Sequence, residues 1–358
     1  MASPCLNEDV VISILSKLPV KSLVRLKCIC KSWNSLIESP LFITTHLNRK
    51  VHHKDYLGLF MSERSTSRTH ISFISYNTMK FSSNLILPFK YPSIIGSCNG
   101  LLCVVDNKFT YYVTNPATRE FKILKEQDEP SADASYGFGF DPMTNDYKLV
   151  RSTVAETEVL TLKNNSWRSI LMSDDDYSTS VMKEVRLVEF WSKAVLSNTL
   201  HWIGESSVQK GKFSIIAFDL IHERFRDINI PGAGDKDFHY QCYSSMFQDC
   251  LSISIICGRT GIDRRVEVWV MKEYGVERSW TKQYCINPNS NVLKLNQMFE
   301  YIGVTIDVNE PLWSTDDLLL VLIAVSNREK ESMVENFTLL LQFCSFVFNC
   351  RESLVPID

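Results

Sequence analysis

The chain has 358 residues, 45% of them hydrophobic and 22% charged, so it can form a large folded unit beside a small one and is not a disordered polypeptide. Its 38 basic and 41 acidic residues give a net charge of −3, which excludes the strongly basic character typical of nucleic-acid-binding proteins. Residues 1–50 hold seven Lys/Arg against three Asp/Glu, which leaves 31 against 38 in the remainder, so a basic head precedes an acidic body.

The eleven cysteines show no paired spacing, and no apolar run is long enough to span a membrane. The first ten residues also lack the apolar stretch of a secretory signal. We therefore expect reduced, mostly buried thiols in a protein of the cytoplasm or the nucleus that makes no membrane contact.

The first predicted element is a helix that begins after Asn7. An Asn side chain suits a helix N-cap, and Glu8 and Asp9 suit the positive end of the helix dipole. Apolar residues then recur at helical spacing: Val10, Val11, Ile14, Leu15 and Leu18. Pro19 predicts the end of this helix.

After Pro19, a second apolar stripe predicts one helix or two short ones. Its members are three or four residues apart: Leu23, Leu26, Cys30, Trp33 and Ile37. Two basic pairs lie outside the stripe: Lys21 with Arg25, and Lys27 with Lys31. A helical head this short buries too little surface to be stable alone. Either the two stripes pack against each other in a helical cap, or a partner covers them.

The head resembles an F-box in one continuous register. The matching residues are Leu6, Asp9, Ile14, Leu15, Leu18, Pro19, Val20, Lys21, Ser22, Leu23, Cys28, Cys30, Lys31, Ser32, Trp33 and Leu36, followed by Ser39, Pro40 and Phe42. The resemblance implies a domain of three helices over residues 1–48 that docks on a Skp-type adaptor and, through it, on cullin and RING subunits of a ubiquitin ligase. It assigns adaptor contact to Leu6, Ile14, Leu15, Leu18, Pro19 and Leu23, and packing between the helices to Leu26, Cys30 and Trp33.

The body repeats itself with a period of a little over fifty residues. Short apolar strands follow a turn residue in "DYLGLF", "NGLLCV", "DYKLVR", "NTLHWI", "DCLSISI" and "DLLLVL", beginning at residues 55, 99, 146, 198, 249 and 317. Pairs of strands joined by a polar turn carry the aromatics Phe121, Trp167, Phe225 and Trp280. Such a period is typical of kelch-type propellers, so residues 52–358 predict an all-β, kelch-like β-propeller of about six blades. A β-sandwich is the alternative.

The body also resembles the F-box-associated module of plant proteins. The resemblance rests on "GSCNGLLCV", "NPATREFK", "YGFGFDPMTNDYKLVR", "EVLTLKNNSWRSI", "NTLHWIG" and "AFDLIHERFRDI". Head and body together are similar to S-locus F-box proteins, the pollen-side factors of self-incompatibility in flowering plants. That similarity implies a protein target, here a basic secreted ribonuclease (S-RNase), for the acidic body. Residues 328–350 depart from the family pattern, which leaves the geometry of the last blade open.

The sequence contains no HExxH, GxSxG, Walker or dinucleotide-binding motif, and its seven His show no metal-pair spacing. His201 is interpreted as a core or rim residue, and no catalytic residue, metal or cofactor is assigned. Target contacts are expected in five loops, residues 62–70, 126–134, 173–182, 231–240 and 258–265, because loops on a rigid scaffold present variable side chains. The leading prediction is a non-catalytic substrate receptor; the alternatives are a propeller that is an enzyme or binds a ligand, and a scaffold that directs no ubiquitin transfer.

Overall fold

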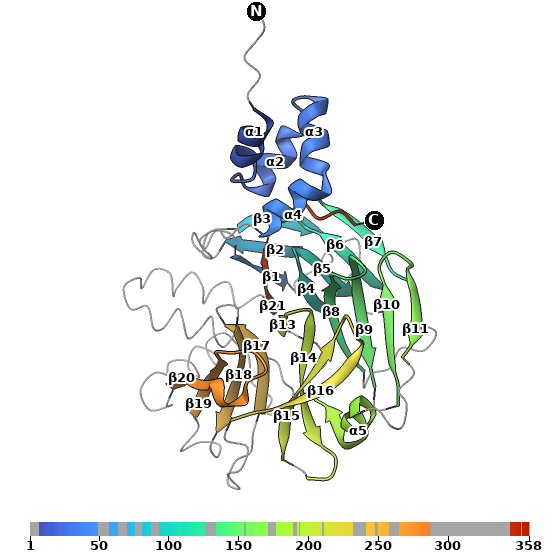
Figure 1. Ribbon diagram of the computed structural model, residues 1–358, viewed down its shortest axis with the longest axis vertical. Coiled ribbons are helices and arrows are strands. Elements are labelled where there is room, and N and C mark those ends of the chain that lie inside the picture. Colours follow the sequence, from blue (N-terminus) through green and yellow to red (C-terminus); the bar gives the residue numbers. More distant parts are fainter. Residues whose placement is uncertain are drawn as a thin grey trace, which may run out of the picture.

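The computed structural model consists of a helical head and a body of β-sheets (Figure 1). It describes residues 7–48, 57–63, 70–75, 81–86, 93–106, 108–125, 134–153, 155–170, 177–188, 192, 194–209, 211–231, 241–247, 250–257, 265–286, 344–351 and 353–357. The predicted order, helices first and strands after them, is confirmed.

The described part of the head, residues 7–48, contains four short helices rather than the three that the F-box resemblance implies. They are α1 (Glu8–Leu15), α2 (Val20–Leu26), α3 (Lys31–Glu38) and α4 (Pro40–Asn48). Ser39 explains the fourth helix, because its hydroxyl accepts a hydrogen bond from the backbone N–H of Phe42 at 3.2 Å and so caps α4. Pro40 follows at the first helical position, where its missing N–H costs nothing.

The body forms five separate antiparallel sheets within the described residues. The first joins β21 (Cys344–Arg351), β1 (Leu57–Glu63), β2 (His70–Ser75) and β3 (Phe81–Ile86) in that order. The second runs β4 (Ser93–Cys98), β5 (Leu101–Val105), β6 (Tyr111–Asn115) and β7 (Glu120–Ile123). The third runs β8 (Ser135–Asp141), β9 (Asp146–Ser152), β10 (Thr157–Thr161) and β11 (Ser166–Ser169).

The last two sheets follow the same plan. The fourth orders β12 (Val185–Leu187), β14 (Thr199–Ser206), β15 (Phe213–Asp219) and β16 (Arg224–Asn229), and β13 (Ala194–Leu196) also pairs with β14. The fifth runs β17 (Gln241–Phe247), β18 (Cys250–Cys257), β19 (Arg265–Met271) and β20 (Trp280–Ile286), with a short 3₁₀ helix at Glu277–Ser279. Helix α5 (Tyr177–Glu184) connects the third and fourth sheets, within a segment predicted to be a loop.

These sheets are consecutive blades of a β-propeller. Strands of successive sheets are in contact in chain order: β21 with β4, β4 with β8, β8 with β14, and β14 with β17. Five independent sheets exclude the β-sandwich alternative. The prediction of six blades is not met by the described residues, because the repeat that begins at Asp317 lies outside them.

The repeat read from the sequence corresponds to equivalent strands. Five of its six apolar copies are β1, β5, β9, β14 and β18, each the second strand of its sheet. The four paired-strand copies are the hairpins β6–β7, β10–β11, β15–β16 and β19–β20, each the third and fourth strands. Both predicted patterns are therefore confirmed over the described residues.

Neighbouring blades are joined by their outer strands as well. The indole N–H of Trp167 on β11 donates to the backbone oxygen of Lys125 at 3.0 Å, and that of Trp280 on β20 donates to the oxygen of Asn229, also at 3.0 Å. Phe225 holds the equivalent position in β16 but has no donor, and its buried ring packs against Phe218 instead.

A close approach of two strands from neighbouring blades requires a glycine. A side chain at Gly137 on β8 would place its Cβ 2.7 Å from side-chain atoms of both Leu200 and Trp202 on β14. Real Cβ contacts are not that short, so only glycine allows the third and fourth blades to pack at this distance.

A buried lysine joins the same two blades. Lys148 on β9 lies 2.8 Å from Asp141 and 2.9 Å from Glu223, and its Nζ donates to the backbone oxygen of Leu220. Burial opposes the charge of Asp141, but hydrogen bonds from Lys148 and Thr144 outweigh it and hold the pKa of this carboxyl below its usual value. The network therefore depends on the lysine charge.

We predict that Lys148→Met destabilises the body by about 3–5 kcal/mol, because it leaves a buried carboxylate without its partner. The measurement is the free energy of unfolding in urea at pH 7. Lys212→Met is the matched control, because Lys212 is exposed, and it should change stability by less than about 0.5 kcal/mol. Equal stability of the two variants would contradict the role assigned to the network.

Candidate adaptor-binding surface

The fold of the head begins as the sequence predicts. The Asn7 side chain accepts a hydrogen bond from the backbone N–H of Asp9 at 3.0 Å, which confirms it as the N-cap of α1. Pro19 stands at the N-cap of α2 in an extended conformation, with φ −60° and ψ 150°. It therefore separates α1 from α2 and turns the chain between them.

The helices bury a small core of their own. Its buried members are Leu15, Val20, Leu23, Ile37 and Phe42, joined by Leu354 from the far end of the chain. Leu15 is 2% exposed and Leu23 is fully buried. Two of the residues assigned to adaptor contact thus lie inside the head.

The other residues assigned to the adaptor are placed differently. Ile14 is 52% exposed, Pro19 is exposed, and Leu18 is partly buried beside the head core. Leu6 lies outside the described residues. Of the residues assigned to packing, Leu26 and Trp33 contact the core, whereas Cys30 is exposed at the N-cap of α3.

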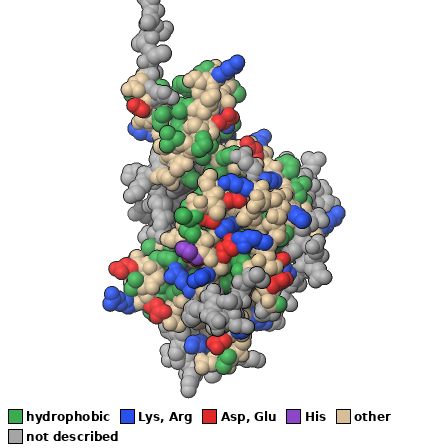
Figure 2. Space-filling model, turned by 45° about the vertical axis from the view of Figure 1, so that its right-hand side comes forward, with side chains coloured by type: hydrophobic (Ala, Val, Ile, Leu, Met, Phe, Trp, Pro, Cys, Tyr) green, Lys and Arg blue, Asp and Glu red, His purple; other side chains and the backbone are tan. Residues whose placement is uncertain are grey.

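The head leaves large apolar side chains uncovered. Val10, Ile14, Ile29 and Leu41 are 43%, 52%, 62% and 75% exposed. Figure 2 shows hydrophobic side chains gathered on the head, with charged side chains beside them. Val10 and Ile14 lie one turn apart on α1, so this part of the head presents an open apolar face, which is a candidate interaction surface. We call Val10, Ile14, Ile29 and Leu41 the exposed apolar set.

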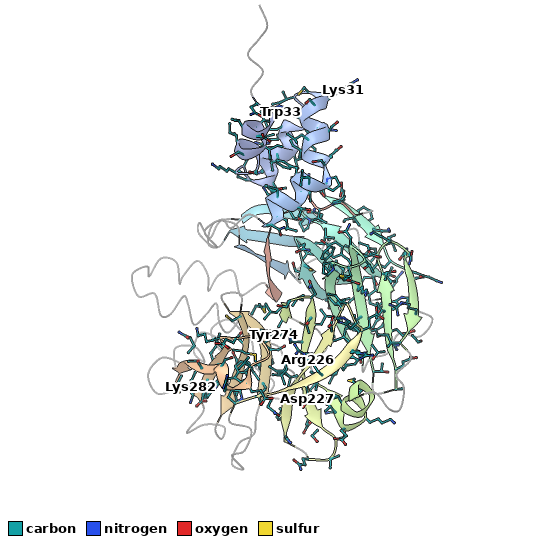
Figure 3. The ribbon with its side chains drawn as sticks, in the orientation of Figure 1. Lys31, Trp33, Arg226, Asp227, Tyr274 and Lys282 are labelled. Atoms are coloured by element: carbon teal, nitrogen blue, oxygen red, sulfur yellow. The ribbon has the colours of Figure 1, made fainter. Side chains whose placement is uncertain are left out.

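The basic pairs of the head differ in their surroundings. Lys27 forms an ion pair with Glu38 at 3.2 Å, and Asn34 donates to the same carboxylate at 3.0 Å. Lys21, Arg25 and Lys31 are exposed, and Figure 3 shows Lys31 at the end of the head remote from the sheets. Their positive charge therefore faces solvent in the isolated chain.

The structure tests few of the loops proposed for target contact. Residues 64–69, 126–133, 173–176, 232–240 and 258–264 lie outside the described residues. The described part of the third loop is α5, whose residues Val181 and Met182 are buried.

His201 is a core residue, as interpreted from the sequence. It is fully buried on β14, with its Nδ1 3.0 Å from the backbone oxygen of Ala194 and its Nε2 2.7 Å from the hydroxyl of Tyr274. A carbonyl can only accept, so Nδ1 carries the proton and Nε2 accepts from the tyrosine. Burial lowers the pKa of His201 to about 4, so the ring is neutral at pH 7. Tyr274 lies under Arg226 and is labelled with it in Figure 3.

Within the described ranges, no group of three or more His, Cys, Asp or Glu is arranged to hold a metal ion. No helix in the described part of the chain is long and apolar enough to cross a membrane. The prediction that the cysteines are mostly buried is wrong for the seven whose burial the structure describes, since Cys28, Cys30 and Cys285 are exposed and two of the seven, Cys103 and Cys242, are buried. Two of the exposed thiols lie in the head, where helices this short cannot cover them.

Comparison with known families identifies both parts of the chain. Residues 3–45 match the F-box domain, and residues 47–328 match the F-box associated beta propeller domain. The second match covers more than half of the chain, so this protein belongs to the family of F-box proteins with an associated β-propeller.

Relatives of the chain include F-box proteins of a plant. The F-box/kelch-repeat protein At3g23880 of Arabidopsis thaliana is 29% identical over 86% of this chain and 82% of its own length. The F-box protein CPR1 of Arabidopsis thaliana is 27% identical over 90% of this chain and 80% of its own length. The recognition of a plant F-box protein with an associated domain is thereby confirmed.

We predict that His201 makes stability depend on pH between about 6.5 and 4. Its pKa is lower in the folded chain than in the unfolded chain, so the stabilisation is complete above pH 6.5 and is lost as the pH falls toward 4. The loss attributable to this residue is about 3 kcal/mol. Unfolding free energies at pH 7 and pH 4 should differ less in His201→Asn than in the wild type. An unchanged difference in His201→Asn would contradict the assignment.

Proposed function

We propose that the protein is the non-catalytic substrate receptor of a Skp–cullin–F-box ubiquitin ligase. The observation that carries the proposal is the exposed apolar set on a head that matches the F-box family. The propeller, which matches the associated domain of the same family, is the part that binds a target protein. Binding the target beside a ubiquitin-loaded enzyme raises the rate of transfer through proximity, without bond chemistry by this chain.

Adaptor contact is proposed for the residues that reach the surface of the head. Ile14 and Pro19 are exposed, and Leu18 is partly exposed beside them, so an adaptor groove can cover all three. Leu15 and Leu23 contribute through the core that orients α1 and α2, because their side chains are already buried. Leu6 remains in the proposed contact set on the F-box resemblance alone.

The proposed target of the propeller is a protein, and no particular protein is assigned as that target. The S-locus resemblance suggests a basic ribonuclease, but neither family match names one, and both relatives above are F-box proteins of Arabidopsis thaliana. Cytoplasmic or nuclear action follows from the proposed partners, because the ligase core works in those compartments.

We predict that Ile14→Asp weakens binding of a Skp-type adaptor by about tenfold or more, because the substitution places a charge where an isoleucine would be buried. The full chain is titrated with purified adaptor by calorimetry. Val208→Asp is the control, because Val208 is 76% exposed on the β14–β15 turn of the body and should leave the affinity unchanged. Equal affinities for Ile14→Asp and the wild type would contradict adaptor binding through this surface.

We further predict that the chain receives ubiquitin itself when it is combined with the adaptor, cullin, RING subunit and charged ubiquitin-conjugating enzyme. A receptor held next to the catalytic subunits exposes its own lysines to transfer, so modification should require an intact head. The assay follows ubiquitin conjugation to the wild type and to Ile14→Asp over time. If ubiquitin is conjugated to both chains at the same rate, transfer does not depend on adaptor binding through the head, and the prediction is wrong.

A further inference from the structure

The chain returns to the head at its C-terminal end. After β21, residues 353–357 pass between the helices and the second blade, where Figure 1 shows the red C-terminal segment beside α4 and β7. Ser353, Leu354 and Val355 are all buried. We call residues 353–357 the tail.

Successive residues of the tail enter two different cores. Leu354 is 5% exposed and belongs to the core of the head, together with Leu15, Leu23 and Phe42. Val355 is 8% exposed and belongs to the core of the second and third blades. Adjacent residues of the tail therefore pack against two different units at once.

Asn115 holds the backbone of the tail in this position. Its fully buried side-chain amide donates to the backbone oxygens of Ser353 at 3.1 Å and Val355 at 2.8 Å. Its side-chain oxygen accepts from the N–H of Ala117 at 3.0 Å, within the β6–β7 turn. One side chain therefore fixes the turn of the second blade and the tail together.

The head completes the junction from its own side. Ile43 and Leu47 of α4 pack against the core of the blades, and Ala117 of the β6–β7 turn packs against the core of the head. The nitrogen Nε2 of His46, also on α4, lies 3.0 Å from the backbone oxygen of Leu18, which ties α4 to the connection between α1 and α2. The contacts thus run from the blade through the tail to the part of the head proposed to bind the adaptor.

We propose that the tail is a clamp that fixes the orientation of the head on the propeller, with Leu354 and Asn115 as its positioning residues. The inference rests on the proposed function, in which that orientation sets the distance between the adaptor and a target bound to the propeller. A clamp of this kind acts on ubiquitin transfer without touching either the adaptor or the target.

The clamp is tested by single-molecule energy transfer within the full-length chain. Dyes are attached through genetically encoded amino acids at Ser35 on α3 and Lys272 after β19, both exposed, which leaves the eleven cysteines unlabelled. The wild type is expected to give one narrow distribution of transfer efficiency. Leu354→Ala removes the contact with the head and should broaden and shift this distribution, whereas Leu354→Met should restore it.

Asn115→Asp is the second variant. It keeps the oxygen that accepts from Ala117 but replaces the amide group with an acceptor that faces two carbonyl oxygens, so it should release the tail while preserving the turn. Leu251→Ala removes an equally buried leucine from β18, far from the junction in sequence, and should lower the melting temperature while leaving the distribution narrow. Circular dichroism identifies any variant that does not fold. The clamp is then judged from the energy-transfer distributions of the variants that do fold.

If the distribution of transfer efficiency stays narrow in both Leu354→Ala and Asn115→Asp, the tail does not act as a clamp. The proposal is also wrong if Leu251→Ala broadens the distribution as much as these two variants do. Adaptor affinity and conjugation of ubiquitin to the chain are measured on the same samples. Asn115→Asp, which lies outside the core of the head, should keep its adaptor affinity and change which of its lysines are modified, a result that loss of stability alone would not give. If the wild type binds no adaptor, the proposed function fails, while the energy-transfer distributions still decide the clamp.

Discussion

The antiparallel pairing of β21 with β1 is the interaction on which the rest of the structure depends. It joins the end of the chain to the first strand of the body, with Leu57 opposite Arg351 and Phe60 opposite Phe348. Because β21 then contacts β4, the first blade is completed by the last strand of the chain and packs against the second. The same strand delivers the tail to the head, so closure of the body and attachment of the helices have one structural origin.

The head shows how a domain of four short helices divides its apolar residues. It buries Leu15, Leu23 and Phe42, and takes Leu354 from the tail to complete its core. Such a small unit has too little interior for all of its apolar side chains, so others stay on its surface. The chain covers one side of the head with its own tail and leaves the exposed apolar set uncovered, and this set is where we propose that the adaptor binds. This division separates internal attachment from external binding.

The sequence predicted local features more reliably than contacts between distant segments. Strand positions and the two repeat tracks followed from alternation and turn residues, which act over a few neighbours. The helical stripe of the head was also correct, but spacing cannot tell a residue that faces its own core from one that faces a partner. The F-box resemblance grouped Leu15 and Leu23 with Ile14, and the structure buries the first two and exposes the third. The signal for α4 was present in Ser39 and Pro40.

Contacts between distant segments could not be predicted in this way. The contact of Leu354 with the head joins residues from opposite ends of the chain, so no pattern among neighbouring residues predicts it. The repeated aromatics also differ in their contacts: Trp167 and Trp280 donate hydrogen bonds to the neighbouring blade, and Phe225 has no N–H to do so.

The central claim is that the head is incomplete until an adaptor covers it. Hydrogen–deuterium exchange of the full-length chain, with and without a purified Skp-type adaptor, tests this most directly because it locates newly covered backbone along the sequence. We predict that added adaptor slows exchange in α1 and α2 and leaves exchange in β8 to β16 unchanged. Exchange that is unaffected in the head, or slowed only in the blades, would contradict it.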